Sequence, residues 1–117
     1  ADLGIPRAKV KVVYPGLNLD GHGGEREVRR DGRLTVGYFA RVCPEKGFHH
    51  AVAAFVALMK APDAPDAVFR ASGWLGPIDQ PFFREQVAKL EAAGLADRFE
   101  YAENPTHADK VAFLRSV

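Results

Sequence analysis

The sequence predicts an α/β protein in which helices cover both faces of a mostly parallel sheet, in a three-layer, Rossmann-like arrangement. Segments rich in β-formers at residues 34–40, 67–73 and 98–102 alternate with stretches of helical periodicity. The connections between them are short, which favours parallel β-α-β units. The chain has 117 residues, of which 47% are apolar and 26% charged, as in an ordinary globular domain. We therefore expect a single α/β unit with one core.

The N-terminal part of the chain contains one short predicted strand and one long predicted loop. Residues 9–14 alternate and are rich in β-branched side chains, and Pro15-Gly16 ends this strand in a turn. Residues 18–32 are polar and include four glycines, which predicts a surface loop. The apolar run at residues 34–40 then predicts a buried strand.

Two amphipathic helices are predicted around the strand at residues 67–73. The first spans residues 47–60, and Pro62 and Pro65 end it. The second begins near Pro81, and Gly94 is placed to cap its end. Their inward-facing side chains are predicted to be Phe48, Val52, Phe55, Val56 and Met59 in the first helix and Phe83, Val87 and Leu90 in the second.

The C-terminal part of the sequence predicts a third strand and a third helix. Residues 98–102 read as a short strand, and residues 106–109 have a capping-box pattern at a helix start. Apolar residues then follow at helical spacing as far as Val117. Because the chain stops inside this pattern, and three core strands are few for such a sheet, we expect a piece of a larger protein. Its sheet would have an open edge that could pair two copies in a dimer.

The composition also excludes several kinds of function. A net charge of +1 gives no basic stripe, which argues against nucleic acid as a partner. No apolar run has the length of a membrane span, and no signal peptide opens the chain. The single cysteine, Cys43, excludes an internal disulfide and fits a reducing, cytoplasmic setting.

The loop at residues 41–47 is the strongest candidate for a binding site. It joins a predicted strand to a predicted helix, which is where open α/β sheets bind ligands. Arg41 and Lys46 add two cations to the unpaired amides and positive dipole end of the following helix. Such a site suits a phosphate or diphosphate. The alternative is that both are solvated loop charges, with Glu45 as a surface partner.

Other reactive or aromatic residues have simpler interpretations. Adjacent side chains on a helix do not face one another, so His49 and His50 are expected to be ordinary surface or partly buried histidines. Cys43 lies near two cations but has no histidine-plus-carboxylate arrangement, which favours a packing role. Trp74 is expected to pack in a loop, and contact with a base or a sugar is the alternative.

Four segments in order resemble the retaining glycosyltransferases of the GT-B fold, group 1 (GT4). Residues 41–47 match the family's Arg-x-x-x-x-Lys-Gly pattern in both residues and spacing. Residues 12–18 resemble the strand and turn that open the family's C-terminal domain, residues 68–73 its next strand and glycine turn, and residues 93–99 the segment leading into its third strand. The family usually has glycine where Ala40 and Ala102 stand here.

This resemblance implies that residues 1–117 are part of the domain that binds a nucleotide-diphosphate sugar. Arg41, Lys46 and Gly47 would hold the donor diphosphate without a metal or other cofactor, and the backbone at residues 101–103 would lie near the base. Weaker donor contacts would come from Gly16, Gly73, Tyr101 and Ala102. The resemblance also implies that the N-terminal acceptor domain and the C-terminal end of the donor domain are absent.

In that interpretation the family's paired glutamates, seven residues apart, would lie beyond Val117, so no catalytic residue is assigned within this chain. The full-length protein would be a retaining, hexosyltransferase-type enzyme with an unknown acceptor, and the isolated fragment would be inactive. Two other functions stay open. One is a non-catalytic nucleotide- or phosphate-binding α/β module, and the other is an interaction domain with the same fold and no ligand.

Overall fold

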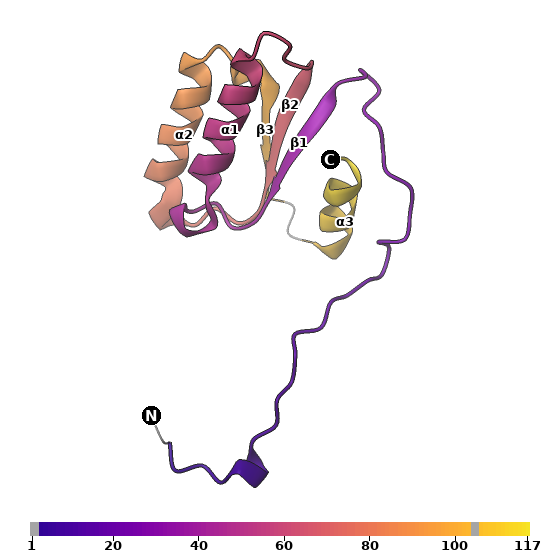
Figure 1. Cartoon of the computed structure of the whole chain (residues 1–117), viewed down its shortest axis with the longest axis vertical. Coiled ribbons are helices and arrows are strands. Elements are labelled where there is room, and N and C mark those ends of the chain that lie inside the picture. Colours follow the sequence, from indigo (N-terminus) through magenta and orange to yellow (C-terminus); the bar gives the residue numbers. More distant parts are fainter. Residues whose placement is uncertain (1–2, 104–105) are drawn as a thin grey trace.

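A parallel three-stranded sheet forms the centre of the protein (Figure 1). The computed structural model describes residues 3–103 and 106–117. The strands β1 (Leu34–Phe39), β2 (Ala67–Ser72) and β3 (Phe99–Ala102) lie in the order β1-β2-β3. Both pairs are parallel, with Leu34 opposite Ala67 and Phe69 opposite Phe99. The alternation of strands and helices in the sequence therefore predicted the sheet correctly.

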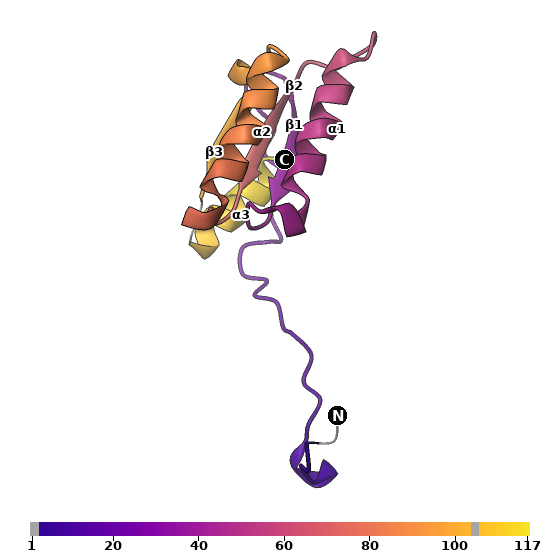
Figure 2. The same cartoon turned by 90° about the vertical axis from the view of Figure 1, so that its left-hand side faces the viewer.

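Helices cover both faces of this sheet, which confirms the three-layer arrangement. The helices α1 (Phe48–Lys60) and α2 (Gln80–Ala92) lie side by side on one face. The helix α3 (His107–Arg115) lies on the other face, as two perpendicular views show (Figures 1 and 2). Short 3-10 turns occur at η1 (Arg7–Lys9), η2 (Pro44–Lys46), η3 (Pro77–Asp79) and η4 (Ala96–Arg98).

The two predicted buried strands differ in how far they are buried. β2 is the central strand, and five of its six residues are buried. β1 pairs only with β2 among the described residues, and Leu34, Gly37 and Phe39 are exposed. The prediction of a buried strand at residues 34–40 is therefore only partly correct. The sequence of an apolar strand does not show whether the strand is central or at an edge. Its burial depends on which other strands and helices pack beside it, and its own residues do not specify these.

The predicted strand at residues 9–14 is wrong. These residues form no strand, and Tyr14 is 85% exposed. The N-terminal stretch that includes these residues leads away from the sheet (Figure 2). Alternating β-branched residues favour extended backbone, but a strand also needs a neighbour to pair its amides and carbonyls. No strand pairs with this segment within the part of the chain that the structure describes.

The core lies between the sheet and the pair α1 and α2, and Phe48 is at its centre. Phe48 is fully buried at the first position of α1. Five aromatic rings have centroids within 6.4 Å of its own, those of Tyr38, Phe69, Phe82, Phe83 and Phe99. Val52 and Phe55 continue the buried face of α1 as predicted, whereas Val56 and Met59 are half-buried at its margin.

The predicted helix signals form as expected. Gly94 takes the left-handed conformation after α2, with φ 74°, and the Leu95 amide donates to the Leu90 carbonyl over 2.9 Å. Thr106 caps α3 in a capping box with Asp109, whose amide donates to the Thr106 hydroxyl over 3.1 Å. Both signals therefore fix a helix end at the residue that the sequence indicated.

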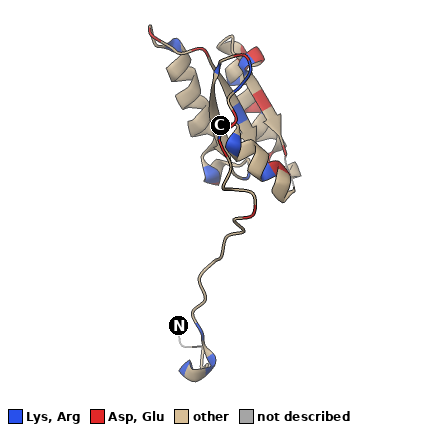
Figure 3. Ribbon diagram, turned by 90° about the vertical axis from the view of Figure 1, so that its right-hand side faces the viewer, with Lys and Arg blue, Asp and Glu red and all other residues tan. Residues whose placement is uncertain are grey.

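Positions of Lys and Arg alternate with positions of Asp and Glu along the ribbon of the described chain (Figure 3). Several of these residues form ion pairs between elements that are distant in sequence. Glu100 on β3 contacts Arg29 at 3.1 Å and Arg70 at 3.0 Å, which ties the loop before β1 to the sheet. Within residues 3–103 and 106–117, no helix has the length and apolar character needed to cross a membrane.

Candidate functional site

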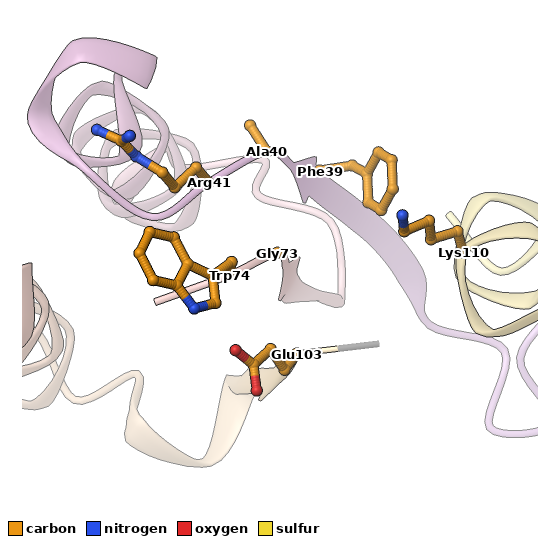
Figure 4. A pocket seen from close by; sticks show the side chains of 7 residues that line it. All are labelled: Phe39, Ala40, Arg41, Gly73, Trp74, Glu103 and Lys110. Carbon is orange, nitrogen blue, oxygen red and sulfur yellow. The ribbon is translucent and has the colours of Figure 1, made fainter. Parts of the chain in front are cut away.

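An open pocket lies where the three parallel strands end. Its volume is about 380 Å³, and residues at or beyond the ends of β1, β2 and β3 contribute to its wall together with one residue of α3 (Figure 4). This is the edge of an α/β sheet at which ligands bind, and the size is within the usual range for a small-molecule site. The lining residues are Phe39, Ala40, Arg41, Gly73, Trp74, Glu103 and Lys110.

A buried tyrosine of β1 holds the loop that carries Arg41 through hydrogen bonds to its backbone. The Tyr38 hydroxyl donates to the Arg41 carbonyl over 2.7 Å, and the Lys46 carbonyl lies 3.4 Å from the same hydroxyl. Burial raises the pKa of Tyr38 to about 12, so the hydroxyl keeps its proton and remains a donor at neutral pH. The loop therefore folds back on itself, with the backbones of Arg41 and Lys46 held by one side chain.

The Arg41 guanidinium is available to a ligand. Its side chain is exposed and pairs with Glu45, one turn away, over 3.7 Å. The pKa of Arg41 is raised, first by the Cys43 side chain and then by the charges of Asp79 and Glu45, so it is a permanent cation. An exposed pair of this kind contributes little to stability, because solvent screens it. An anionic ligand could displace Glu45 at little cost.

Gly73 allows the ends of β1 and β2 to approach each other closely. A Cβ atom at this position would lie 1.8 Å from the Ala40 carbonyl oxygen, and φ is 144°. The Tyr101 hydroxyl donates to the Gly73 carbonyl over 2.7 Å. Just beyond, the Val42 amide donates to the Trp74 carbonyl over 2.9 Å. Hydrogen bonds therefore join all three strand ends beneath the pocket.

Of the residues predicted to contact a donor, Arg41 and Gly73 line this pocket. Lys46 and Gly47 lie on the same loop but do not line it. Lys46 is exposed, and Gly47, with φ 75°, links η2 to the start of α1. Among the described residues, no side chain caps the first amides of α1.

The other residues predicted as weaker donor contacts, Gly16, Tyr101 and Ala102, do not line the pocket. Gly16 lies in the extended N-terminal segment, where a Cβ atom would meet no heavy atom within 4 Å, and it has no place in the pocket wall. Tyr101 supports the floor through Gly73, and its pKa is raised by burial and then by the charge of Glu103. Ala102 ends β3, next to Glu103. The structure thus brings the ends of all three strands to one place but leaves Gly16 apart.

Five of the seven lining residues were not predicted as site residues, namely Phe39, Ala40, Trp74, Glu103 and Lys110. The resemblance placed only the backbone at residue 103 near the base, and contact with a base or a sugar was the alternative to packing for Trp74. Trp74 and Glu103 each follow a predicted strand closely, so the rule that ligands bind beyond the carboxyl ends of strands would have selected them. Lys110 comes from α3, whose position over the other face of the sheet could not be derived from its own periodicity. Its amino group adds a second cation to the pocket.

The histidine pair lies elsewhere. His49 is partly buried and His50 is exposed, as expected, but the expectation that the two do not face one another is wrong. The rings of His49 and His50 have centroids 3.9 Å apart, so these neighbours do face each other at the start of α1. They border a separate groove of about 630 Å³ between α1 and α2. Among the described residues, no three histidine, cysteine, aspartate or glutamate side chains are grouped closely enough to hold a metal ion.

The fold has a counterpart among solved structures. No protein-family model matches the chain, and no curated protein matches it in sequence. The chain is similar to the C-terminal domain of a glycosyl transferase group 1 family protein, LpcC, from Francisella tularensis, with a TM-score of 0.65 and 22% sequence identity. The similarity covers 72% of this chain and 43% of that one. Over that part, the chain has the Rossmann-like α/β fold of the C-terminal domain of a group 1 glycosyltransferase.

Proposed function

We propose that this chain is the donor-binding part of a retaining glycosyltransferase of group 1 (GT4), which transfers a hexosyl group from a nucleotide-diphosphate sugar to an acceptor. The pocket at the carboxyl ends of β1, β2 and β3, with Arg41 in its wall, carries this proposal. The similarity in fold supports it, as does the Arg-x-x-x-x-Lys-Gly pattern at residues 41–47. The chain spans 43% of the related chain, which is itself a C-terminal domain, so the activity is proposed for the whole enzyme and not for this part alone.

The proposed chemistry explains why cations are needed at this position. The bond between the anomeric carbon and a diphosphate oxygen breaks, and a new bond to an acceptor oxygen forms. Negative charge grows on the leaving oxygen, so fixed cations stabilise the transition state more than the ground state. Arg41 offers a planar fork of donors, and Lys46 offers a compact charge on the same loop. We expect these residues and the amides at the start of α1 to hold the diphosphate without a metal.

The proposal also includes the substrates and the cellular compartment of the protein. The donor is a nucleotide-diphosphate sugar, the acceptor is unidentified, and the protein works in the cytoplasm, where its free, buried Cys43 stays reduced. A dimer formed through an open sheet edge stays a prediction, which the molecular mass of the chain in solution would check.

We expect Lys46→Ala to weaken binding of nucleoside diphosphates by about tenfold or more, ~1.4 kcal/mol or above, because a charge-assisted bond to phosphate is lost. Isothermal titration of the chain with UDP, GDP and ADP would measure this. Arg41→Ala should act in the same direction, and Glu45→Gln should strengthen binding by removing a competing carboxylate. Lys60→Ala, at the far end of α1, is the matched control and should change nothing.

Binding that is equally strong in the wild-type chain, Lys46→Ala and Arg41→Ala would contradict the assignment of the diphosphate site. An absence of binding by all three nucleotides would contradict the proposed function as a whole for this chain.

A further inference from the structure

We propose that Trp74 is the platform on which the base of the nucleotide stacks. This inference rests on the proposed function, since it assigns one part of the same ligand to one wall of the same pocket. Trp74 is the chain's single tryptophan, and it lines the pocket next to Arg41 and Gly73 (Figure 4). Its position in the sequence alone favours packing within a loop, whereas its place in the pocket wall favours contact with a ligand.

The exposure of Trp74 argues against a purely structural role. A tryptophan side chain that packs a loop buries its ring, yet Trp74 is 54% exposed in a pocket wall. Its own loop covers part of the ring. A Cβ atom at Gly76 would lie 2.7 Å from the ring, so Gly76 leaves space for the indole to lie against the backbone. The exposed part of the ring surface is accessible to a ligand.

The backbone of Trp74 is held in place, so its ring is presented by a fixed support. The Val42 amide donates to the Trp74 carbonyl over 2.9 Å, which ties this residue to the loop that carries Arg41. The neighbouring Gly73 carbonyl accepts from the Tyr101 hydroxyl over 2.7 Å. A ligand bound to both Arg41 and Trp74 would therefore meet two groups whose backbone segments are hydrogen-bonded to each other.

The charges around the pocket give the ligand a direction. Arg41 and Lys110 are cations, whereas the Glu103 carboxylate lies across the pocket from Arg41, beyond Trp74 (Figure 4). Phosphates are attracted to the cations and repelled by Glu103. The uncharged half of a nucleotide, with its hydroxyl and N–H donors, suits the wall formed by Trp74 and Glu103. A base there can stack on the indole, since every base has a π-face.

The single tryptophan makes the proposal directly measurable in the 117-residue chain. We expect UDP, GDP and ADP to change the fluorescence of Trp74 on binding, and inorganic pyrophosphate to bind without that change. Trp74→Ala should weaken binding of the three nucleotides about tenfold, and Trp74→Phe should keep it within about threefold. Pyrophosphate affinity should be the same in both variants. Ile78→Ala, an 88% exposed apolar side chain on the same loop outside the pocket wall, is the control and should bind as the wild type does.

Two results would overturn this inference while leaving the proposed function standing. In the first, calorimetry detects nucleotide binding, but binding does not change the fluorescence of Trp74, and the Trp74→Ala variant binds nucleotides as tightly as the wild type. In the other, glucose 1-phosphate quenches the tryptophan and UDP does not, which would assign the ring to the sugar. If neither the nucleotides nor pyrophosphate bind, the proposed function and this inference both fail.

Discussion

Phe48→Ala is expected to lower the free energy of unfolding by about 3–5 kcal/mol, the usual cost of truncating a fully buried phenylalanine. The side chain has no exposed surface and lies among five aromatic rings contributed by β1, β2, α2 and β3. Its loss would leave a cavity between the sheet and the helices that those elements cannot all close together. A domain of this size is stable by about 5–15 kcal/mol, so a large share of its stability would be lost.

Chemical denaturation followed by circular dichroism would measure this loss. Phe82→Ala is a suitable comparison, because Phe82 contacts Phe48 but is itself only partly buried. We expect a clearly smaller effect there. Equal and small effects of both substitutions would mean that the core is not organised around Phe48.

Gly73→Ala is expected to destabilise the chain by about 3 kcal/mol or more and to distort the pocket. The backbone at residue 73 has φ 144°, a conformation that residues with a side chain rarely adopt. Forcing alanine into it costs about 1–3 kcal/mol of backbone strain. The added methyl group would also meet the Ala40 carbonyl oxygen at 1.8 Å, so the ends of β1 and β2 would have to separate. The hydrogen bond from Val42 to Trp74 would then be broken or lengthened, and Arg41 and Trp74 would move apart.

Gly32→Ala separates the two causes. Gly32 has φ 73°, but a Cβ atom there would meet no heavy atom within 4 Å, so this substitution adds strain without a clash. We expect it to cost only about 1 kcal/mol by thermal or chemical denaturation. A Gly73→Ala variant no less stable than Gly32→Ala would show that the close approach of the two strand ends is not required.

The repeating elements of this fold are predictable from the sequence because their signals are local. The apolar face of α1 is set by the spacing of Phe48, Val52 and Phe55, while Gly94 sets the end of α2 and Thr106 the start of α3. Each of these signals acts within one or two helical turns, so it can be recognised without knowing the rest of the structure.

The failures have a common physical cause, which is that pairing and burial depend on distant parts of the chain. Residues 9–14 have the composition of a strand, but none of the described residues forms a strand beside them. Residues 34–40 are apolar although β1 lies at an edge of the described sheet. The rings of His49 and His50 lie 3.9 Å apart between centroids, an arrangement that helical spacing alone does not determine.

The candidate site was predicted in part for the same reason. The strand-to-helix position of the loop identified Arg41, and the resemblance identified Gly73, but the clash that makes a glycine necessary there involves the carbonyl of Ala40, at the end of a different strand. Trp74 and Glu103 follow predicted strands, so the rule for strand ends could have selected them, whereas Lys110 joins the site through the placement of α3, which no local pattern specifies.

The central claim is that the pocket at the carboxyl ends of the strands holds a nucleoside diphosphate. Mapping of amide chemical shifts by NMR during titration with UDP would test it most directly. We expect the largest shifts at residues 40–47 and 73–76, together with the single indole N–H of Trp74. Shifts confined to the groove between α1 and α2, or no shifts at millimolar UDP, would contradict the claim.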